Sequence, residues 1–404
     1  MNQGKPAELL SVDDALTQLL SLVKTPTRSD TVDTMYADGR VLAQDVLSPM
    51  NVPGFDNSAM DGYAIAVAAD QTAPFTLPVV QRIAAGQTGQ PLQPGQAARI
   101  FTGAPVPEGT TAVVMQEDTV TVEAGIEIQH TPKTGQHIRR VGEDIATGSV
   151  VVAAGTRLTP VELALIASVG IPTVQVYRPL RVATLFTGDE LSMPGEPLPP
   201  GGIYNSNRFS ITALLRRLGC VVTDLGNVPD NREATLAALK EAAAEHDVVM
   251  TSGGVSVGEE DHVKAAVETL GSLALWRIAM KPGKPLAFGH IGQTAFVGLP
   301  GNPVSSYVTL AMLVRPFLLA SMGCTDYMPL VLNVPAGFVW SKADKRREFL
   351  RGRLNASGQV ELFKNQGSGV MTSLAWADGL VDVLPHTTVA AGDLVRFVPL
   401  SQLM

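Results

Sequence analysis

The chain has 404 residues, a length that predicts about two to four domains, and 45% of them are hydrophobic and 17% charged, which indicates a globular protein with ample core material. A formal net charge of -8 makes the chain a poor candidate for general nucleic-acid binding, and any anionic ligand must be held by a local site. The two cysteines, Cys220 and Cys324, exclude a disulfide framework and a four-cysteine zinc site.

Two segments bear on the location of the protein. Residues 1–20 lack the basic start of a secretory signal. The most apolar segment, residues 307–322, contains Arg315 and Pro316 and is too short to span a membrane, so we predict a buried helix there. We therefore expect a soluble, cytoplasmic protein with no membrane partner and no nucleic-acid partner.

The first part of the chain predicts one helix and then mostly β structure. Ser11 precedes acidic residues and an apolar helical pattern, so a helix should begin there, and Pro26 should end it. Short apolar runs between Gly and Pro turns predict strands from residue 64 to about 138, and a short helix should follow Pro160. RRVGED, residues 139–144, is most simply interpreted as a surface ion-pair cluster, which stabilises little.

The loop PGFDNSAMDGY, residues 53–63, combines turn-forming residues with Phe55, Met60 and Tyr63. A solvated loop seldom carries so much apolar area. Two interpretations stay equally open. The loop packs on its own domain, or it is a binding loop that another surface covers.

From residue 182 the pattern changes to alternating strands and helices. We expect helices to begin at Asn205, near Asn231, near residue 260 and at Asn302, with Phe209 and several leucines of the first helix facing inward. This alternation predicts βαβ units and a parallel sheet that is covered on both faces. Ligands of such sheets bind beyond the carboxyl ends of the strands. The motifs TGDE (187–190), TSGGVS (251–256) and GLPGNP (298–303) all follow strands and should meet at one edge.

The TSGGVS motif has the character of an anion site. Gly253 and Gly254 permit a close approach of backbone N–H groups to a ligand, between a strand and a helix. Glu259 and Asp261 would repel a phosphate unless a cation lay between them, so we infer Mg²⁺. KPGKP, residues 281–285, adds two lysines on a stiff backbone. This edge suits a Mg²⁺-dependent reaction on a phosphorylated or nucleotide-bearing ligand.

Beyond residue 327 the chain predicts a small, closed or nearly closed sheet. Two polar stretches there, RREFLR (346–351) and NQGSG (365–369), are interpreted as a solvated strand face and a flexible turn. Other sites are excluded by pattern, because the histidines form no i, i+4 pair and the chain has no Walker A motif and no nucleophile elbow.

The motifs PGFDNSAMDGY, TGAPVP (102–107), TGDE, TSGGVS, KPGKP and GLPGNP together resemble the molybdopterin molybdenumtransferase family (MoeA and the E domain of gephyrin), in order and over nearly the whole chain. The resemblance implies a multidomain α/β plus β fold, with a central doubly wound, mostly parallel α/β domain of the molybdopterin-binding type. It assigns residues 1–48 and 141–178 to an elongated α+β dimerisation domain, 49–140 to an inserted β domain, 179–326 to the α/β domain and 327–404 to a C-terminal β-barrel-like domain.

The resemblance also implies a reaction. Molybdate and adenylylated molybdopterin bind, molybdenum is inserted at the dithiolene, and AMP leaves with the help of Mg²⁺. The implied catalytic residues are Asp61, Glu190, Asp230, Asp261 and Lys281, and Asp261 is the implied Mg²⁺ ligand. The implied substrate-binding residues are Thr102, Asp144, Gly253, Gly254, Ser256, Lys284, Pro285, Ser305, Arg351 and Ser368.

Within this set, the resemblance places Gly253, Gly254 and Ser256 on the nucleotide phosphate and the two lysines near molybdate, with Arg351 and Ser368 reaching molybdate from the last domain. Asp61, Thr102 and Asp144 would come from the second subunit of a homodimer, which would also cover the loop 53–63. Arg277 departs from the Lys that bacterial relatives often carry, which alters the geometry of anion binding there.

Two alternatives share the fold. A molybdopterin adenylyltransferase has the central α/β domain and normally lacks the flanking domains. A non-catalytic scaffold would need no edge of acids and lysines, so Asp61, Glu190, Asp261, Lys281 and Lys284 argue against it. Further implied partners are a molybdopterin adenylyltransferase and the enzymes that receive the cofactor.

Overall fold

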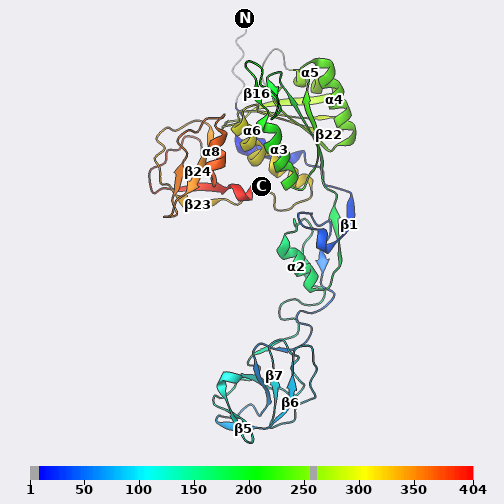
Figure 1. Ribbon diagram of the computed structural model, residues 1–404, viewed down its shortest axis with the longest axis vertical. Coiled ribbons are helices and arrows are strands. Elements are labelled where there is room, and N and C mark those ends of the chain that lie inside the picture. The colour runs from blue at the N-terminus through cyan, green and yellow to red at the C-terminus, as the bar shows by residue number, and fades with distance from the viewer. Residues whose placement is uncertain (1–8, 255–261, 404) are drawn as a thin grey trace.

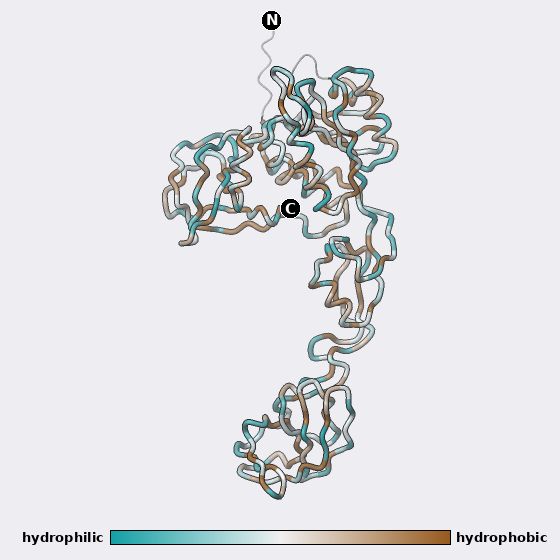
Figure 2. Tube along the Cα trace, in the orientation of Figure 1, coloured by the Kyte–Doolittle hydropathy of each residue, from teal (hydrophilic) through white to brown (hydrophobic). Residues whose placement is uncertain are grey.

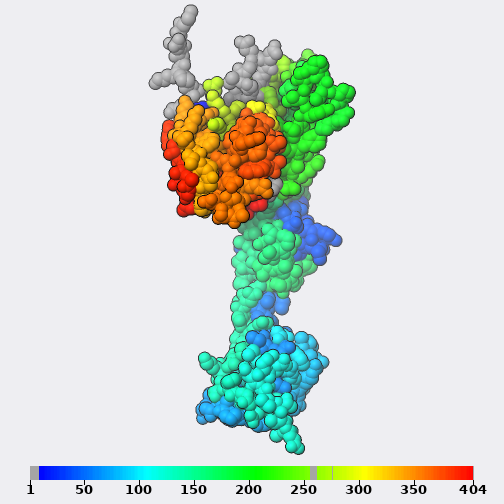
Figure 3. All heavy atoms as spheres, turned by 60° about the vertical axis from the view of Figure 1, so that its left-hand side comes forward, coloured from blue at the N-terminus to red at the C-terminus, as the bar shows by residue number. Residues whose placement is uncertain are grey.

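The computed structural model describes residues 9–254 and 262–403. The molecule is elongated. A central α/β region and a C-terminal β region lie together at one end, and an inserted β region stands at the other end (Figure 1). Figure 3 shows the C-terminal region packed against the central one, with the narrow connecting region below them. This arrangement confirms the predicted multidomain α/β plus β fold.

The central sheet has the strand order β17-β14-β18-β22-β21-β19. The first four strands are parallel: β17 (Val221–Val228), β14 (Arg181–Thr187), β18 (Val248–Ser252) and β22 (Thr294–Leu299). β21 (Pro285–Ile291) and β19 (Gly271–Arg277) follow in antiparallel pairs. Every residue of β18 is buried, as expected for a parallel strand with both faces covered.

Helices cover both faces of this sheet. α3 (Ser206–Arg217) packs on one face, where Ile211 and Leu215 share a core with Val182 of β14. α4 (Arg232–Glu245) and α5 (His262–Leu270) pack on the other face, where Leu239 shares a core with Ala183. Successive residues of β14 therefore serve opposite cores, which confirms the doubly wound arrangement. Figure 2 shows apolar residues gathered in the interior of this region.

One long helical segment fills the first of these cores. It consists of α6 (Pro303–Thr309), a π-helical turn (Leu310–Val314) and α7 (Arg315–Ser321). Pro316 lacks the N–H that a regular ladder needs, so the π turn falls just before it. Pro303–Ser321 is the one helix of the described chain that is long and apolar enough to cross a membrane, but 83% of its most apolar window is buried inside the protein. It is a core helix, as predicted.

The first helix, α1 (Val12–Ser21), packs on this segment. The Ser11 hydroxyl accepts a bond from the Asp14 N–H (3.0 Å), as expected for a cap, and Leu19 shares the core of Phe317. The helix ends at Ser21, so the prediction that Pro26 ends it is wrong. The predicted domain boundaries stay a prediction, but α1 lies against the central region and not in the elongated one.

The elongated region links the two ends of the molecule. β1 (Ser29–Asp33) pairs with β13 (Thr173–Tyr177), and β2 (Val46–Leu47) pairs with β12 (Val150–Val152). A short 3-10 turn (Thr34–Tyr36) and α2 (Pro160–Ser168) complete it. α2 begins with a capping box of Thr159 and Glu162.

The inserted region is all β. β3 (Asn57–Ser58) pairs with β11 (Ile138–Arg139) where the chain enters and leaves it. A four-stranded sheet contains β6 (Val79–Ile83), β7 (Gln96–Ile100), β4 (Gly62–Ala66) and β8 (Ala112–Met115). A three-stranded sheet contains β5 (Phe75–Leu77), β10 (Gly125–Ile128) and β9 (Thr119–Val122), which a 3-10 turn (Gln116–Asp118) precedes.

The C-terminal region is a nearly closed sheet. Its order is β20 (Met280–Lys281), β24 (Arg347–Leu354), β26 (Gly379–Val383), β27 (Leu394–Pro399) and β23 (Leu332–Pro335), with β25 (Val360–Leu362) also paired to β24. A bridge between Ala336 and Val360 brings the last strand back towards β25. α8 (Met371–Trp376) and a final 3-10 turn (Leu400–Gln402) flank the sheet. β20 comes from the central region, so strand pairing joins the two regions.

Candidate active site

Three predicted motifs meet at the carboxyl edge of the central sheet. β14, β18 and β22 are parallel neighbours that end at Thr187, Ser252 and Leu299. The Gly253 N–H donates to the Leu299 carbonyl (3.3 Å), which ties two of the motifs together. The expected convergence is therefore confirmed for residues 187–190, 251–254 and 298–303, while Ser256 and Asp261 lie outside the described residues.

The glycines of the second motif are required by their surroundings. Gly253 and Gly254 have φ values of +93° and +63°, which other residues rarely adopt. A Cβ on Gly254 would lie 2.7 Å from the Thr187 hydroxyl and 2.6 Å from a methyl group of Val263. A Cβ on Gly253 would lie 3.0 Å from the Thr187 carbonyl, so the backbone of this turn packs closely on the end of β14.

A buried polar network that the sequence did not predict supports the edge. The Asn207 side-chain amide of α3 donates to the Ser252 hydroxyl (2.9 Å) and to the Gly301 carbonyl (2.7 Å). The Ser252 hydroxyl donates to the Pro300 carbonyl (3.0 Å). The network fixes the GLPGNP loop against β18. The sequence offered one indication of this network, since Asn207 stands in the first turn of a helix whose N-cap, Asn205, was predicted.

Two acidic residues follow neighbouring strands at this edge. β14 pairs with β17 up to the pair Thr187 and Val228, and Glu190 and Asp230 come just beyond these residues. The Ile203 N–H donates to the Glu190 carbonyl (2.8 Å), where β15 (Leu191–Ser192) pairs with β16 (Ile203–Tyr204). Both carboxylates are exposed and open to a ligand.

The KPGKP turn lies at the same edge. β21 begins at Pro285 and runs antiparallel to β22, with Ala287 opposite Gly298, so the residues before Pro285 lie beside the GLPGNP loop. Gly283 has φ +108°, and a Cβ on it would lie 2.4 Å from the Thr309 hydroxyl of α6. Lys284 is exposed. The Lys281 ammonium donates to the Glu348 carboxylate of β24 (2.7 Å).

The two serines predicted to bind substrate lie beside each other. The Val304 N–H, next to the buried Ser305, donates to the Ser368 carbonyl (3.0 Å). The NQGSG turn of the C-terminal region therefore touches the start of α6. This contact brings the last domain to the predicted edge.

The Arg351 side chain lies beneath the NQGSG turn, and its predicted role toward molybdate stays a prediction. Its side chain is fully buried and donates to the Ser373 hydroxyl (3.1 Å), the Phe349 carbonyl (3.0 Å) and the Gly367 carbonyl (3.3 Å). Burial lowers the pKa of its guanidinium to about 10. In this structure Arg351 holds the NQGSG turn and is not exposed at the edge. The interpretation of residues 346–351 as a solvated strand face is wrong, since Glu348 is buried as well.

The remaining predicted residues lie in or near the inserted region. The Asp61 carboxylate accepts bonds from the Thr102 N–H and hydroxyl (both 2.8 Å), and these bonds, the N–H first, lower the pKa of Asp61. Asp144 is exposed in the connection to this region, with its N–H bonded to Val52. Figure 1 places the inserted region at the end of the molecule opposite the central sheet. One chain alone does not bring these residues to the edge.

The loop 53–63 is anchored and yet partly exposed. Arg140 pairs with Asp56 (2.6 Å), and the Val141 N–H donates to the same carboxylate (2.8 Å), so the RRVGED stretch forms an ion pair with this loop. The Val141 bond is the largest of the causes that lower the pKa of Asp56. Asn57 and Ser58 are buried, whereas Phe55 stays half exposed. The loop packs at Asn57 and Ser58 and leaves apolar surface exposed at Phe55 and Met60.

The described residues of this edge offer carboxylates for a bound Mg²⁺ but no complete set of protein ligands. Among residues 9–254 and 262–403, no three His, Cys, Asp or Glu side chains group as a metal site. Mg²⁺ in phosphate-binding sites usually takes only one or two carboxylates and completes its shell with water and phosphate oxygens. The exposed carboxylates of Glu190 and Asp230 suit that requirement.

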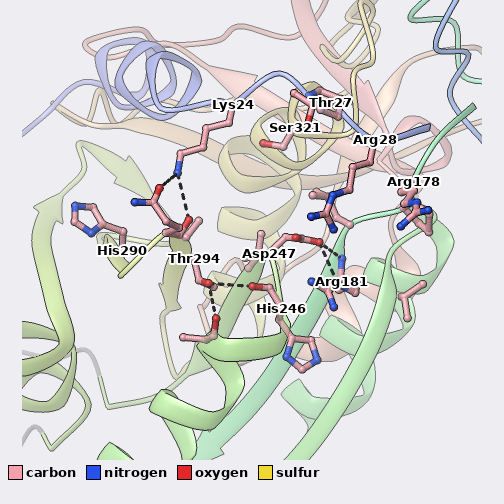
Figure 4. Close-up of a pocket in the computed structure, with 18 of the residues that line it drawn as sticks. Lys24, Thr27, Arg28, Arg178, Arg181, His246, Asp247, His290, Thr294 and Ser321 are labelled. Atoms are coloured by element: carbon pink, nitrogen blue, oxygen red, sulfur yellow. Dashed lines mark hydrogen bonds and ion pairs between the residues drawn. The ribbon is translucent and has the colours of Figure 1, made fainter. Parts of the chain in front are cut away.

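A cavity of about 1030 Å³ lies at the other edge of the sheet (Figure 4). It is lined by the first residues of β14, β17 and β18 and by residues of the 22–30 connection. Three of the cations that line it have partners within the chain: Lys24 bonds to the Gln293 amide (2.8 Å), Arg178 pairs with Asp30 (2.8 Å) and Arg181 pairs with Asp247 (3.7 Å). Since ligands of parallel sheets bind at the carboxyl ends of strands, we assign the site to the opposite edge.

Comparisons with known proteins agree with this geometry. Family models match three parts of the chain: the MoeA N-terminal region (domain I and II) at residues 10–170, a probable molybdopterin binding domain at 183–320, and the MoeA C-terminal region (domain IV) at 333–400. The chain is 42% identical to the molybdopterin molybdenumtransferase of Haemophilus influenzae over 404 residues, which cover 98% of this chain and 100% of that protein. It belongs to the molybdopterin molybdenumtransferase (MoeA) family.

Other members of the MoeA family extend the likeness. The molybdopterin molybdenumtransferase of Nostoc sp. is 37% identical over 401 residues, covering 95% of this chain and 92% of that protein. A crystal structure of a MoeA protein from Pyrococcus horikoshii is 31% identical, covers 97% of this chain and 99% of that chain, and has a TM-score of 0.75. A second from this organism is 26% identical, covers 97% and 100%, and has a TM-score of 0.84. The match extends over the flanking regions as well as the central sheet, as expected for a MoeA protein and not for a lone adenylyltransferase domain.

Proposed function

We propose that this protein inserts molybdenum from molybdate into adenylylated molybdopterin and releases AMP, which gives the Mo-molybdopterin cofactor. The observation that carries the proposal is the meeting of the glycine turn, the lysine turn and the GLPGNP loop at one edge of the sheet. That edge combines a glycine turn at the end of a parallel strand with the exposed Lys284 and the partly exposed Lys281, which suits an oxyanion and a nucleotide phosphate.

Each group at the edge has a proposed role. The N–H groups near Gly253 and Gly254 bind the phosphate, together with Ser256, which lies outside the described residues. Lys281 and Lys284 are point charges for molybdate, with Pro285, Ser305 and Ser368 beside it. Glu190 and Asp230 line the pterin or nucleotide pocket. Arg351 acts through the NQGSG turn that it holds.

Mg²⁺ is the proposed cofactor. Asp261, outside the described residues, is its proposed ligand, and Glu190 and Asp230 are two further carboxylates at the described part of the edge. When bound, the ion would neutralise negative charge on the phosphate of the nucleotide. The lysines and the backbone N–H groups of this chain orient the oxyanions around it.

The proposed site is completed by a second copy of the chain. Asp61 and Thr102 are bonded to each other in the inserted region, far from the central edge of their own chain, and Asp144 lies in its connection (Figure 1). A homodimer in which each inserted region covers the partner's edge would bring them there and would bury Phe55. We propose a cytoplasmic homodimer whose partners are a molybdopterin adenylyltransferase and the enzymes that receive the cofactor.

The test is an assay of AMP release from adenylylated molybdopterin, with molybdate present and absent. The proposal predicts that molybdate and Mg²⁺ are both required and that Lys284→Ala lowers the rate while the protein stays folded. Pyrophosphate production from ATP and molybdopterin would instead indicate the adenylyltransferase. Binding of a protein partner without molybdate-dependent AMP release would indicate the scaffold.

A further inference from the structure

Glu348 is a buried carboxylate with two donors. It lies in β24 and only 2% of its surface is exposed. One of its oxygens accepts from the Lys281 ammonium (2.7 Å) and the other from the Trp340 indole N–H (2.8 Å). A carboxylate this deeply buried is stable only when it is paired and hydrogen-bonded, and these two donors meet that need.

The pair connects two regions of the molecule. β20 runs parallel to β24, with Met280 beside Arg347 and Lys281 beside Glu348. The Arg347 N–H donates to the Ala279 carbonyl (2.8 Å), so the backbones are bonded next to the ion pair. Lys281 belongs to the KPGKP turn at the site, whereas Glu348 belongs to the C-terminal sheet.

Lys281 remains available to a ligand in this arrangement. An ammonium has three donors, and one of them is used by Glu348. The Lys281 side chain is 37% exposed, against 2% for that of Glu348. A flexible lysine loses much rotamer freedom when it is ordered by a ligand, and a fixed partner removes that cost beforehand.

We propose that Glu348 is a positioning residue, which holds the Lys281 ammonium at the edge before an oxyanion substrate binds. The inference rests on the proposed function for the identity of that substrate. The same device is known in protein kinases, where a glutamate holds the strand lysine that contacts the nucleotide phosphates. The C-terminal sheet thus takes part in the site through a side chain that never touches the substrate.

Asp382 offers a matched control. It is a carboxylate of the neighbouring strand β26, buried to the same degree, and it pairs with Arg347 (2.6 Å) and Arg396 (2.8 Å). Neither partner belongs to the motifs at the edge. Asp382→Asn removes a buried charge from the same sheet and leaves Lys281 with its carboxylate.

The experiment measures kcat and KM for molybdate in the full-length protein for Glu348→Gln, Asp382→Asn, Lys281→Met and the double variant Lys281→Met/Glu348→Gln. We expect Glu348→Gln to lower kcat/KM for molybdate by about 10–100-fold, the range found when the group that orients a metal-binding side chain is removed. Asp382→Asn should change it by less than about threefold. In the Lys281→Met background, Glu348→Gln should add almost nothing, because it acts through Lys281.

Two results would overturn the inference. One is an equal loss for Asp382→Asn and Glu348→Gln, and the other is an undiminished effect of Glu348→Gln when Lys281 is absent. If Glu348→Gln does not fold, Trp340→Phe removes only the second donor to the carboxylate. A partial loss of molybdate affinity in that variant supports the inference, and unchanged affinity contradicts it.

Direct binding separates this inference from the proposed function. Equilibrium dialysis with molybdate alone needs no AMP release. If the wild type releases no AMP but binds molybdate, and Glu348→Gln weakens that binding only while Lys281 is present, the proposed reaction fails and the positioning role stands. If the wild type binds no molybdate, the positioning role fails too.

Discussion

Gly254 occupies a position that no side chain can take without displacing its neighbours. Its φ is +63°, and a Cβ would lie 2.6 Å from Val263 and 2.7 Å from Thr187. We expect Gly254→Ala to lower the free energy of unfolding by about 2–4 kcal/mol, combining backbone strain with overpacking. Gly292→Ala is the control, because it has a similar φ of +58° but nothing within 4 Å of the added atom.

Urea unfolding measures the loss of stability in both variants. Gly292→Ala reports the cost of backbone strain alone, and Gly254→Ala reports backbone strain together with the steric clash. Gly292→Ala should cost only about 1–2 kcal/mol. Equal costs at the two positions would show that the Thr187 contact does not restrict residue 254. The need for glycine and for a positive φ was predicted from the sequence. The collision was not, because Thr187 and Val263 reach this turn only through sheet and helix packing.

Cys220 and Cys324 are buried thiols. Burial raises the pKa of Cys220 to about 12 and that of Cys324 to about 11, from an ordinary value of 9.0. We expect neither thiol to react with a disulfide reagent at pH 8 in the folded protein, and both to react after denaturation. Rapid reaction of either thiol in the native state would contradict their burial.

The same thiols give a pH dependence of stability. Below pH 9 the thiols are protonated in both the folded and the unfolded state, so they do not change the free energy of unfolding with pH. Above pH 9 the thiols ionise in the unfolded state but stay protonated in the folded state. Ionisation stabilises the unfolded state, so the free energy of unfolding falls by about 1.4 kcal/mol per thiol and pH unit up to pH 11–12. The variant Cys220→Ala/Cys324→Ala should lack this part of the alkaline decline, measured by urea unfolding at each pH.

At the scale of elements, α1 belongs to the central core although it begins the chain. Leu19 is fully buried beside Phe317, whereas Leu22, at the end of the helix, is half exposed. Leu19→Ala should lower the free energy of unfolding by about 2–5 kcal/mol, the usual cost of a cavity in a core. Leu22→Ala should cost less than about 1 kcal/mol. Similar values would show that α1 does not dock on the central region.

The helices and strands of the central region were predicted well because the sequence patterns that mark them are local. Strand runs and helix caps such as Ser11 and Asn205 can be recognised within a few residues. Phe209 was placed inward incorrectly, and it is 53% exposed. At 100° per residue, Phe209 lies about 180° from Leu218 around the helix axis, on the face that α3 turns to solvent. Counting the angle corrects that prediction.

The interpretation of residues 346–351 as a solvated strand face was wrong for a different reason. Its charges look like those of a solvated face, but Glu348 pairs with Lys281, which lies 67 positions away. The Arg351 side chain donates to Ser373 and to the Gly367 carbonyl, which lie 22 and 16 positions away. No local pattern reports such partners. The buried network joining Asn207, Ser252 and Gly301 escaped prediction for the same reason.

At the scale of the whole molecule, the proposed site needs two chains. Lys284 lies at the central edge, and Asp61 lies at the far end of the same chain (Figure 1). In a symmetric dimer with shared sites, each site would take its edge from one chain and its inserted region from the other. Variants that damage each part separately should therefore complement each other when they occupy different chains.

The most direct test is the activity of a heterodimer purified through two different tags, with Asp61→Ala in one chain and Lys284→Ala in the other. Each parent homodimer should be inactive. The heterodimer should show about half the wild-type rate of molybdate-dependent AMP release, because one of its two sites would take both parts from undamaged chains. A heterodimer as inactive as its parents, or no dimer carrying both tags, would contradict the shared site.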